Sequence, residues 1–135
     1  MREILFRGKS LKTGKWTQGY LFRCWERAYI LWGMVNDNAD MTEVHPETVC
    51  QYTGLTDKCG NKIFENDIIE CRRKDRRFQS QIEWDCKCGG FMFQDSKEGS
   101  MVGLDSLLDG GIYNDFEVIG NIFDNPELLQ GVGSE

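Results

Sequence analysis

The feature that most constrains the fold is a two-residue alternation of side chains along short runs. It is clearest in FQSQIEWD at 78–85, where Phe78, Ser80, Ile82 and Trp84 occupy one face and the intervening residues are all polar. A period of two is typical of a half-buried β-strand, because successive side chains of a strand point to opposite faces. Several such runs, separated by turn residues, predict a mainly β protein that is rich in hairpins.

The first third of the chain predicts three strands. Ile4 and Phe6 alternate with charged residues, the turn KTGK follows at 12–15, and alternation resumes over 16–22. A third apolar run, YILWGM at 29–34, continues the pattern. Together these runs predict an N-terminal β meander.

A polar stretch at 35–48 follows, and we interpret it as a connecting loop. It contains Pro46, which pushes the residue before it toward extended geometry. The loop is the expected boundary between two parts of the chain. We therefore expect an N-terminal β subdomain with its connecting loop at 1–48, a C-terminal subdomain at 49–130 and a loose tail at 131–135.

The second half opens with QYTGLTDKCGNKIFENDIIE at 51–70, in which two apolar runs flank a turn at 57–61. This segment predicts a hairpin, because Gly60 and Asn61 adopt positive φ at little cost. Further predicted elements are a hairpin of strand 78–85, turn 86–90 and strand 91–93, a helical turn at 103–108, a strand with a central glycine at 115–123 and a short C-terminal helix at 124–129.

Composition and charge narrow the class of protein. With 135 residues, 40% of them hydrophobic, the chain suits one compact domain or two small subdomains. A net charge of −6 opposes general binding to nucleic acid or anionic membranes. No apolar run approaches the roughly 20 residues that cross a bilayer, and the first ten residues lack the order of a secretion signal. We therefore expect a cytoplasmic protein without membrane contact, whose six cysteines are reduced thiols.

One short segment opposes the overall acidity. RRKDRR at 72–77 carries a local charge of +4, which leaves −10 on the rest of a chain whose total is −6. Its cations are Arg72, Arg73, Lys74, Arg76 and Arg77. The plainest interpretation is a solvated turn that also discourages aggregation at a sheet edge. The alternatives are contact with an acidic protein, or with nucleic acid, where Phe78 and Trp84 would stack on single-stranded bases.

Three other groups of side chains resemble reactive or metal-binding sites. Cys86 and Cys88 leave a single residue between them, fewer than the two to four that usually separate paired zinc ligands. His45 has no nucleophile or orienting group near it in the sequence. Glu65 and Asp67 can share a face, but a structural role for Asp67 in its turn is the simpler expectation. The sequence therefore predicts no enzyme, no bound metal and no cofactor.

Aromatic side chains are numerous, and we expect most of them to form the core. Those assigned to strands are Trp16, Tyr20, Phe22, Trp25, Trp32, Trp84, Phe91 and Phe93. Trp25 and Trp32 are the candidates for exposed positions. If exposed, they would form an interface, since contiguous exposed apolar surface marks association sites. This alternative predicts a homo-oligomer.

Four segments, in order along the chain, resemble the YopX family of bacteriophage and prophage proteins. They are REILFRGKSLKTGKW at 2–16, HPETV at 45–49, QYTGLTDKCGNKIFENDIIE at 51–70 and EVIGNIFDNPELL at 117–129. Two residues depart from the family pattern: Asn66 stands for the usual glycine before Asp67, and Cys50 for a frequent glycine before Gln51. Asn tolerates left-handed geometry, so we expect the turn before Asp67 to survive.

The resemblance implies a mainly β protein whose C-terminal half is a small SH3-like barrel. It also implies a phage accessory protein, and it supplies no catalytic residues. We therefore expect a non-enzymatic module that binds an unidentified protein partner, with nucleic-acid binding by the turn at 72–77 as the alternative. The hairpin from Tyr52 to Asp67 would be the scaffold and that turn the contact surface.

Overall fold

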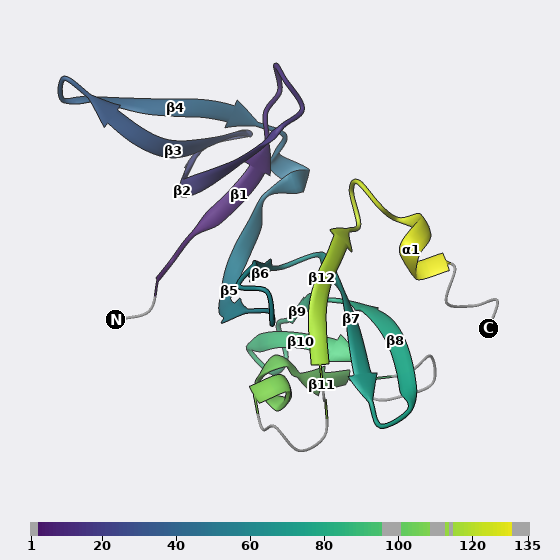
Figure 1. Cartoon of the computed structure of the whole chain (residues 1–135). Coiled ribbons are helices and arrows are strands. Elements are labelled where there is room, and N and C mark those ends of the chain that lie inside the picture. Colours follow the sequence, from purple (N-terminus) through teal and green to yellow (C-terminus); the bar gives the residue numbers. More distant parts are fainter. Residues whose placement is uncertain (1–2, 96–100, 109–112, 114, 131–135) are drawn as a thin grey trace. The chain divides into compact units, whose positions relative to one another are not determined.

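The computed structural model describes residues 3–95, 101–108, 113 and 115–130 (Figure 1). The chain divides into two compact units, Met1–Gly54 and Leu55–Glu135. Both are built mainly from antiparallel strands, so the predicted mainly β class is confirmed. The division lies a few residues beyond the boundary expected at 48, and the tail predicted at 131–135 falls outside the described residues.

The N-terminal unit is organised around one antiparallel sheet. Its elements are β1 (Phe6–Lys9), β2 (Trp16–Cys24), β3 (Arg27–Val35), β4 (Asn38–Val44), the 3-10 helix η1 (Pro46–Thr48) and β5 (Cys50–Thr56). The strand order is β4-β3-β2-β1-β5, so each strand pairs with the next in sequence until β5 returns beside β1. The predicted meander is therefore confirmed, with one strand more than expected.

The N-terminal sheet curls until its two sides meet. Ser10, directly after β1, forms an isolated bridge with Val44, and the Leu11 N–H donates to the Glu43 carbonyl at 3.0 Å. Gly8 permits this approach, because a Cβ there would lie 2.7 Å from a Val44 methyl carbon. The enclosed core consists of Ala28, Ile30 and Val44, with Phe6, Leu21 and Val49 packed against it.

The connecting loop predicted at 35–48 is wrong for most of its length, because β4 occupies residues 38–44. Asn36 and Asp37, with φ of 51° and 66°, form the two-residue turn between β3 and β4. Positive φ at both positions matches the twist of paired strands, and Asn and Asp tolerate it. The stretch is polar because β4 ends the sheet order and most of its side chains are half-buried or exposed.

The described part of the C-terminal unit contains two three-stranded antiparallel sheets. Its elements are β6 (Lys62–Phe64), β7 (Asp67–Arg73), β8 (Arg76–Gln81), β9 (Glu83–Asp85), β10 (Gly90–Gln94), β11 (Met101–Gly103), the 3-10 helix η2 (Leu104–Leu108), β12 (Asp115–Asn121) and α1 (Glu127–Gln130). The sheet orders are β12-β7-β8 and β11-β10-β9, while β6 follows β5 in the first sheet. The SH3-like barrel expected here stays a prediction.

The core of the C-terminal unit draws side chains from both of its sheets and from η2. It comprises Ile63, Ile69, Cys71, Phe78, Ile82, Phe93, Leu104, Leu107 and Tyr113. Phe93 is fully buried, and its ring centroid lies 5.4 Å from that of Tyr113. Burial raises the pKa of Cys71 to about 12, which keeps this thiol protonated.

The strand predicted at 78–85 is divided into β8 and β9, which belong to different sheets. The break falls at Ile82, whose N–H donates to the Asp67 carbonyl at 2.9 Å. Phe78 and Ile82 are buried as the alternation predicts, whereas Trp84 beyond the break is 49% exposed. Periodicity could not detect this break, because the alternation continues through it.

Several local predictions in the second half are confirmed. The β9–β10 hairpin, the 3-10 turn η2 and a short helix after Pro126 all form. The register of β12 shifts between Val118 and Gly120, as the central glycine indicated. Asn66 adopts a φ of 71°, so the left-handed turn before Asp67 survives the loss of glycine. None of the described helices is long and apolar enough to cross a membrane.

Candidate functional site

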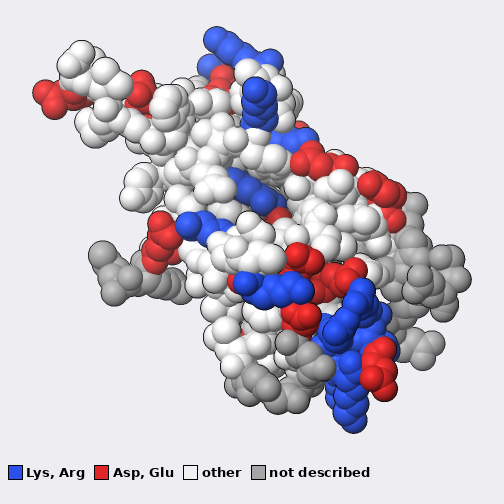
Figure 2. Space-filling view, in the orientation of Figure 1, with Lys and Arg blue, Asp and Glu red and all other residues white. Residues whose placement is uncertain are grey.

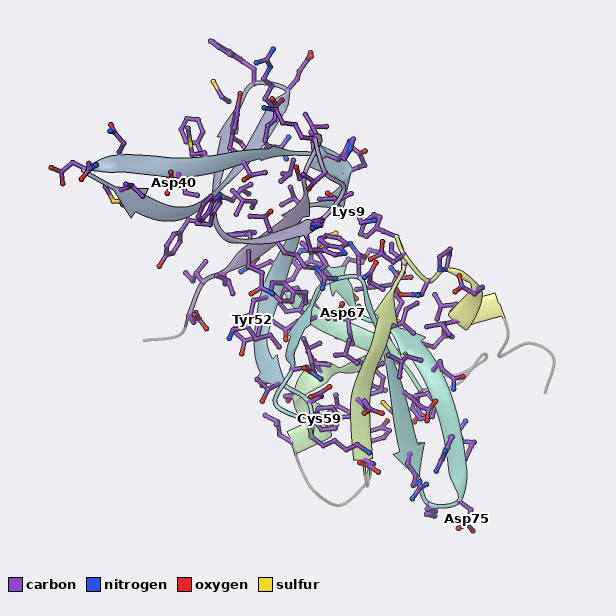
Figure 3. The ribbon with its side chains drawn as sticks, turned by 45° about the horizontal axis from the view of Figure 1, so that its top comes forward. Lys9, Asp40, Tyr52, Cys59, Asp67 and Asp75 are labelled. Carbon is purple, nitrogen blue, oxygen red and sulfur yellow. The ribbon has the colours of Figure 1, made fainter. Side chains whose placement is uncertain are left out.

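The basic turn predicted at 72–77 forms the tip of the β7–β8 hairpin, where Figure 3 labels Asp75. Lys74 and Asp75 make its two-residue loop, with Lys74 at a φ of 57°. All five cations predicted for the contact surface therefore lie at one hairpin end. Facing residues of an antiparallel pair share a face of the sheet, so the four arginines divide into two pairs on opposite faces.

Arg73 and Arg76 form the first pair, and both bind Asp95, which directly follows β10. The Arg76 guanidinium donates to one carboxylate oxygen at 2.7 Å, while Arg73 and the Tyr113 hydroxyl donate to the other. Burial alone would raise the pKa of Asp95, but these hydrogen bonds and charges hold it below its usual value. Burial and the Asp95 carboxylate raise the pKa of Tyr113 to about 12. Two cations of the turn are thus committed to an internal network.

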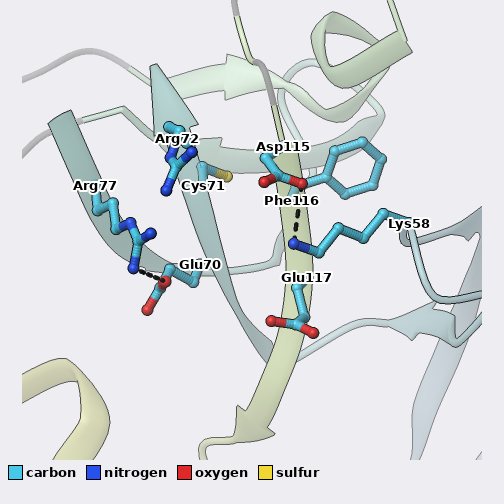
Figure 4. Close-up of a pocket in the computed structure, with 8 residues that line it drawn as sticks. All are labelled: Lys58, Glu70, Cys71, Arg72, Arg77, Asp115, Phe116 and Glu117. Carbon is cyan, nitrogen blue, oxygen red and sulfur yellow. Dashed lines mark ion pairs between the residues drawn. The ribbon is translucent and has the colours of Figure 1, made fainter. Parts of the chain in front are cut away.

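Arg72 and Arg77 form the second pair, on the face of the sheet that points away from the core residue Phe78. A hollow of about 120 Å³ lies on this face (Figure 4). It is lined by Lys58, Glu70, Cys71, Arg72, Arg77, Asp115, Phe116 and Glu117. Lys58 Nζ lies 3.1 Å from an Asp115 oxygen, and Arg77 lies 3.9 Å from Glu70. The three cations and three anions of the lining balance.

Within the described part of the chain, Arg72 and Lys74 are the cations of the basic turn that make no ion pair. Arg72 is half-buried and Lys74 is exposed. Figure 2 shows red carboxylates beside the blue atoms of this hairpin, so the surface is of mixed sign. Binding to a phosphate backbone depends on cations that are free to replace counterions, and the turn has few of them.

Tyr52 and Asp67, the predicted scaffold residues, are both buried, with 8% and 1% of their surfaces exposed. The Tyr52 N–H donates to the Leu5 carbonyl at 2.8 Å. A carboxylate oxygen of Asp67 accepts the Phe64 N–H at 2.7 Å and so closes the β6–β7 turn, as expected. Their burial suits a structural role better than direct contact with a partner.

Asp57 is a second buried carboxylate, which sequence reasoning did not single out. It accepts hydrogen bonds from the backbone N–H groups of Cys59, Asn61 and Val118 at 2.8 to 2.9 Å. Burial alone would raise its pKa, but these hydrogen bonds hold the pKa below its usual value. Asp57 therefore ties the turn at 57–61 to β12. The Asp-x-x-Gly-Asn pattern is a turn signal, but it gives no hint of the distant Val118.

The N-terminal unit presents a surface of a different kind, which we call the apolar face. In the strand register, Tyr20, Leu31 and Met41 form one row across β2, β3 and β4. Phe22 and Tyr29 form the next row, with ring centroids 6.0 Å apart. Met34 extends the same face beyond the first row, since it is opposite Ala39, two residues from Met41. The apolar face thus comprises Tyr20, Phe22, Tyr29, Leu31, Met34 and Met41.

This face is open to solvent. Tyr20 is 68% exposed, Phe22 49%, Met34 69% and Met41 50%. The expectation that Tyr20 and Phe22 belong to the core is therefore wrong. Both faces of β2 and β3 carry apolar side chains, and the core forms on the other face, around Ala28 and Ile30. The alternation assigns residues to faces, but it cannot say which face is covered.

The β3–β4 hairpin continues beyond its neighbour β2 as a two-stranded arm, residues 32–40 (Figure 1). Trp32 is 55% exposed and donates its indole N–H to the Thr42 hydroxyl at 2.9 Å, on the side opposite the apolar face. Trp25, in the β2–β3 turn, is 93% exposed, so the alternative of exposed positions holds for both tryptophans and their assignment to the core is wrong. Two-stranded ribbons are marginally stable in water, and this arm therefore gains from any partner that covers it.

The other groups considered for chemistry are dispersed over the surface. Cys86 and Cys88 are exposed thiols in the β9–β10 turn. The His45 ring lies 3.6 Å from a Glu47 carboxylate oxygen. Across the residues that the structure describes, no three His, Cys, Asp or Glu side chains are grouped to hold a metal ion.

The fold and these surfaces define a small β protein of two units, one with an exposed apolar sheet face and the other with a charged one. The chain belongs to the YopX protein family, whose pattern it matches over residues 5–130. The resemblance seen in the sequence is therefore confirmed, and it spans nearly the whole chain.

Among solved structures, the chain is similar to the crystal structure of protein EF1440 from Enterococcus faecalis. The TM-score is 0.59, with 21% sequence identity over 96% of this chain and 99% of that chain. At this identity the likeness concerns the fold alone. No curated protein matches the sequence.

Proposed function

We propose that the protein is a phage or prophage accessory protein that acts in the host cytoplasm as a non-enzymatic protein-binding module. The association with phage rests on the family resemblance. The observation that carries the binding role is the apolar face, where four side chains are 49% to 69% exposed. Aromatic residues and methionine are enriched in the buried centres of protein interfaces, and both types are present here.

A partner that covers the apolar face would gain free energy from the burial of its side chains. Covering an apolar side chain completely stabilises a complex by about 1.5 to 3 kcal/mol before the costs of association are deducted. The apolar face offers two rows of such side chains on a sheet that already holds them in place. A partner that matches this face would bury them with little loss of backbone freedom.

The alternative is nucleic-acid binding by the basic turn, in which Arg72 and Lys74 would meet phosphates. The pairing of Arg73 and Arg76 with Asp95 favours the protein-binding role over nucleic-acid binding, because it leaves two of the five cations less able to contact phosphates. The carboxylates of Glu70, Asp115 and Glu117 beside Arg72 would also repel phosphates.

The proposal is tested by capture of partners from host lysate with three immobilised forms of the protein. They are the wild type, the apolar-face variant Met34→Asp, and the basic-turn double variant Arg72→Ala with Lys74→Ala. We expect proteins that are retained by the wild type and the basic-turn variant and lost by the apolar-face variant. Identical capture by all three forms would contradict the proposal.

The alternative is tested by fluorescence anisotropy of labelled DNA and RNA at low and moderate salt. Phosphate-driven binding falls steeply over this range, whereas binding through an apolar face does not. Salt-sensitive binding that disappears in the basic-turn variant would establish the alternative in place of the proposed contact.

A further inference from the structure

We infer that the hollow on the outer face of the β12-β7-β8 sheet binds a small zwitterion of the α-amino acid class. The carboxylate of the ligand meets Arg72, and its ammonium group lies between Glu70 and Glu117. This site belongs to the C-terminal unit, so it goes beyond the proposed protein-binding role and does not depend on the apolar face.

Like charges face each other across the strands that line this hollow (Figure 4). In the register, Glu117 of β12 is opposite Glu70 of β7. Two residues further along β7, on the same face of the sheet, Arg72 is opposite Arg77 of β8. Like charges that are directly opposite each other destabilise a sheet. A ligand that brings a cation to the first row and an anion to the second would offset this cost.

The ion pairs within the lining leave one cation and one anion over. Four of its six charged groups pair with each other. Among the residues that the structure describes, Arg72 and Glu117 are the two charged groups of the lining that make no ion pair. Both are half-buried, and Glu117 accepts a hydrogen bond from the Cys59 thiol, a weak donor, at 3.5 Å. A ligand with one charge of each sign completes this set, whereas a simple anion or cation leaves one of the two without a partner.

The mixed charges of the lining also disfavour two other classes of ligand. A phosphate group would meet Arg72 but would be repelled by three carboxylates. A divalent metal ion would be repelled by three cations, and Ca²⁺ needs six to eight oxygen ligands. The lining therefore favours a molecule with two poles and no net charge.

The size of the hollow limits the ligand further. Its volume is about 120 Å³, below the roughly 300 to 1,000 Å³ of pockets for drug-sized molecules. A cavity of about 150 Å³ holds benzene, so this hollow suits a ligand of about six non-hydrogen atoms. Glycine, alanine and serine are zwitterions of this size, whereas a nucleotide is far larger.

The spacing of the two rows suits the head group of an α-amino acid. Glu70 and Arg72 are two residues apart along β7, which is about 7 Å. The ammonium and carboxylate groups of an α-amino acid are joined through one carbon atom, so charge-assisted hydrogen bonds of about 2.8 Å reach from them toward both rows. The planar guanidinium of Arg72 can bind a carboxylate through two parallel hydrogen bonds.

The inference is tested by titrating the full, isotope-labelled chain with glycine, L-alanine and L-serine and recording the backbone amide resonances. We expect saturable shifts at β7 and β12, around Glu70, Arg72 and Glu117. Two analogues of alanine are the matched chemical controls: alaninamide lacks the carboxylate and propionate lacks the ammonium group. Each should bind at least about tenfold more weakly than alanine, because a hydrogen bond between charged groups is lost. Absence of shifts with all three amino acids, or equal binding of alanine and either analogue, would overturn the inference.

Two variants assign the poles of the ligand. Arg72→Gln and Glu117→Gln each remove one charge while keeping a polar side chain of moderate size, and each should weaken alanine binding at least about tenfold. Lys74→Ala is the matched control, because Lys74 belongs to the same hairpin but does not line the hollow, and it should bind alanine as the wild type does. Wild-type affinity in both Gln variants would contradict the assignment. The analogue titrations use the wild type alone, so they remain decisive if a variant fails to fold.

Discussion

The two units of this protein differ in how many apolar residues they bury and in which residues they expose on their sheets. Of the described residues, three form the buried cluster of the N-terminal unit and nine form that of the C-terminal unit. The N-terminal unit leaves a row of aromatic and methionine side chains exposed, whereas the C-terminal unit covers the outer side of its β12-β7-β8 sheet with charges. The buried carboxylates described here, Asp57 and Asp67, both belong to the C-terminal unit.

The two units obtain their stability in different ways. The C-terminal unit has enough apolar material to close a core, and its buried carboxylates satisfy backbone N–H groups that strands alone do not pair. The N-terminal unit closes a smaller core and keeps apolar material on its surface, which is what an association surface requires. Protein binding is thus expected from the part with the smaller core.

The largest expected effect tests the difference in burial. Phe93 is fully buried between Phe78 and Tyr113, so Phe93→Ala should lower the free energy of unfolding by about 4 kcal/mol. Phe22→Ala is the matched control in the N-terminal unit and should cost less than about 1 kcal/mol, because that ring is half exposed. Urea denaturation measures both values. Equal losses would mean that the apolar face is part of a core after all.

A smaller loss is expected from the buried carboxylate. Asp57→Ala leaves backbone N–H groups of Cys59, Asn61 and Val118 without their acceptor, and should lower the free energy of unfolding by about 3 kcal/mol. Asp75→Ala, at the exposed hairpin tip, is the control and should change it by less than about 0.5 kcal/mol. Hydrogen exchange should locate the loss in the C-terminal unit, and uniform loss in both units would contradict the assignment.

Acidification should lower the free energy of unfolding of the C-terminal unit less than Asp57→Ala does, since a protonated carboxyl group still accepts hydrogen bonds. The pKa values of Asp57 and Asp95 are lower in the folded chain than their ordinary 3.8. The stability that they contribute is therefore present above about pH 4 and is lost as pH falls through the lowered folded values. Chemical denaturation between neutral pH and pH 2 should show this decline, and Asp57→Asn should make it shallower. An unchanged pH profile in Asp57→Asn would contradict the role of that carboxylate.

The smallest effect is expected at the basic turn. Arg72→Ala with Lys74→Ala should leave the free energy of unfolding within about 0.5 kcal/mol of the wild type, because neither side chain makes an ion pair in the described structure. Asp95→Ala should cost more, since it leaves Arg73, Arg76 and Tyr113 without their shared acceptor. Thermal unfolding of the two variants in parallel orders these effects, and the reverse order would show that Asp95 does not hold the hairpin.

Sequence patterns predicted most of the elements, because the signals for strands and turns lie in residues that are neighbours in the chain. The hairpins of the second half, the left-handed Asn66 and the bulge near Gly120 all follow from residues close to one another in the chain. The same reasoning failed at 35–48, where the Asn36–Asp37 turn signal was present but β4 is too polar to resemble a strand. It also failed at Ile82, where one alternation serves two strands.

The functional surfaces, too, were predictable from the sequence only where they depend on residues that are close together in the chain. The sequence by itself determined the mainly β class, the family and the cluster of cations at 72–77. Only the tertiary structure decided that Asp95 neutralises Arg73 and Arg76, and that Tyr20 and Phe22 lie in the open. The physical reason is that alternation specifies two faces of a strand, whereas the partner of each face is set by contacts between residues that are distant in the chain.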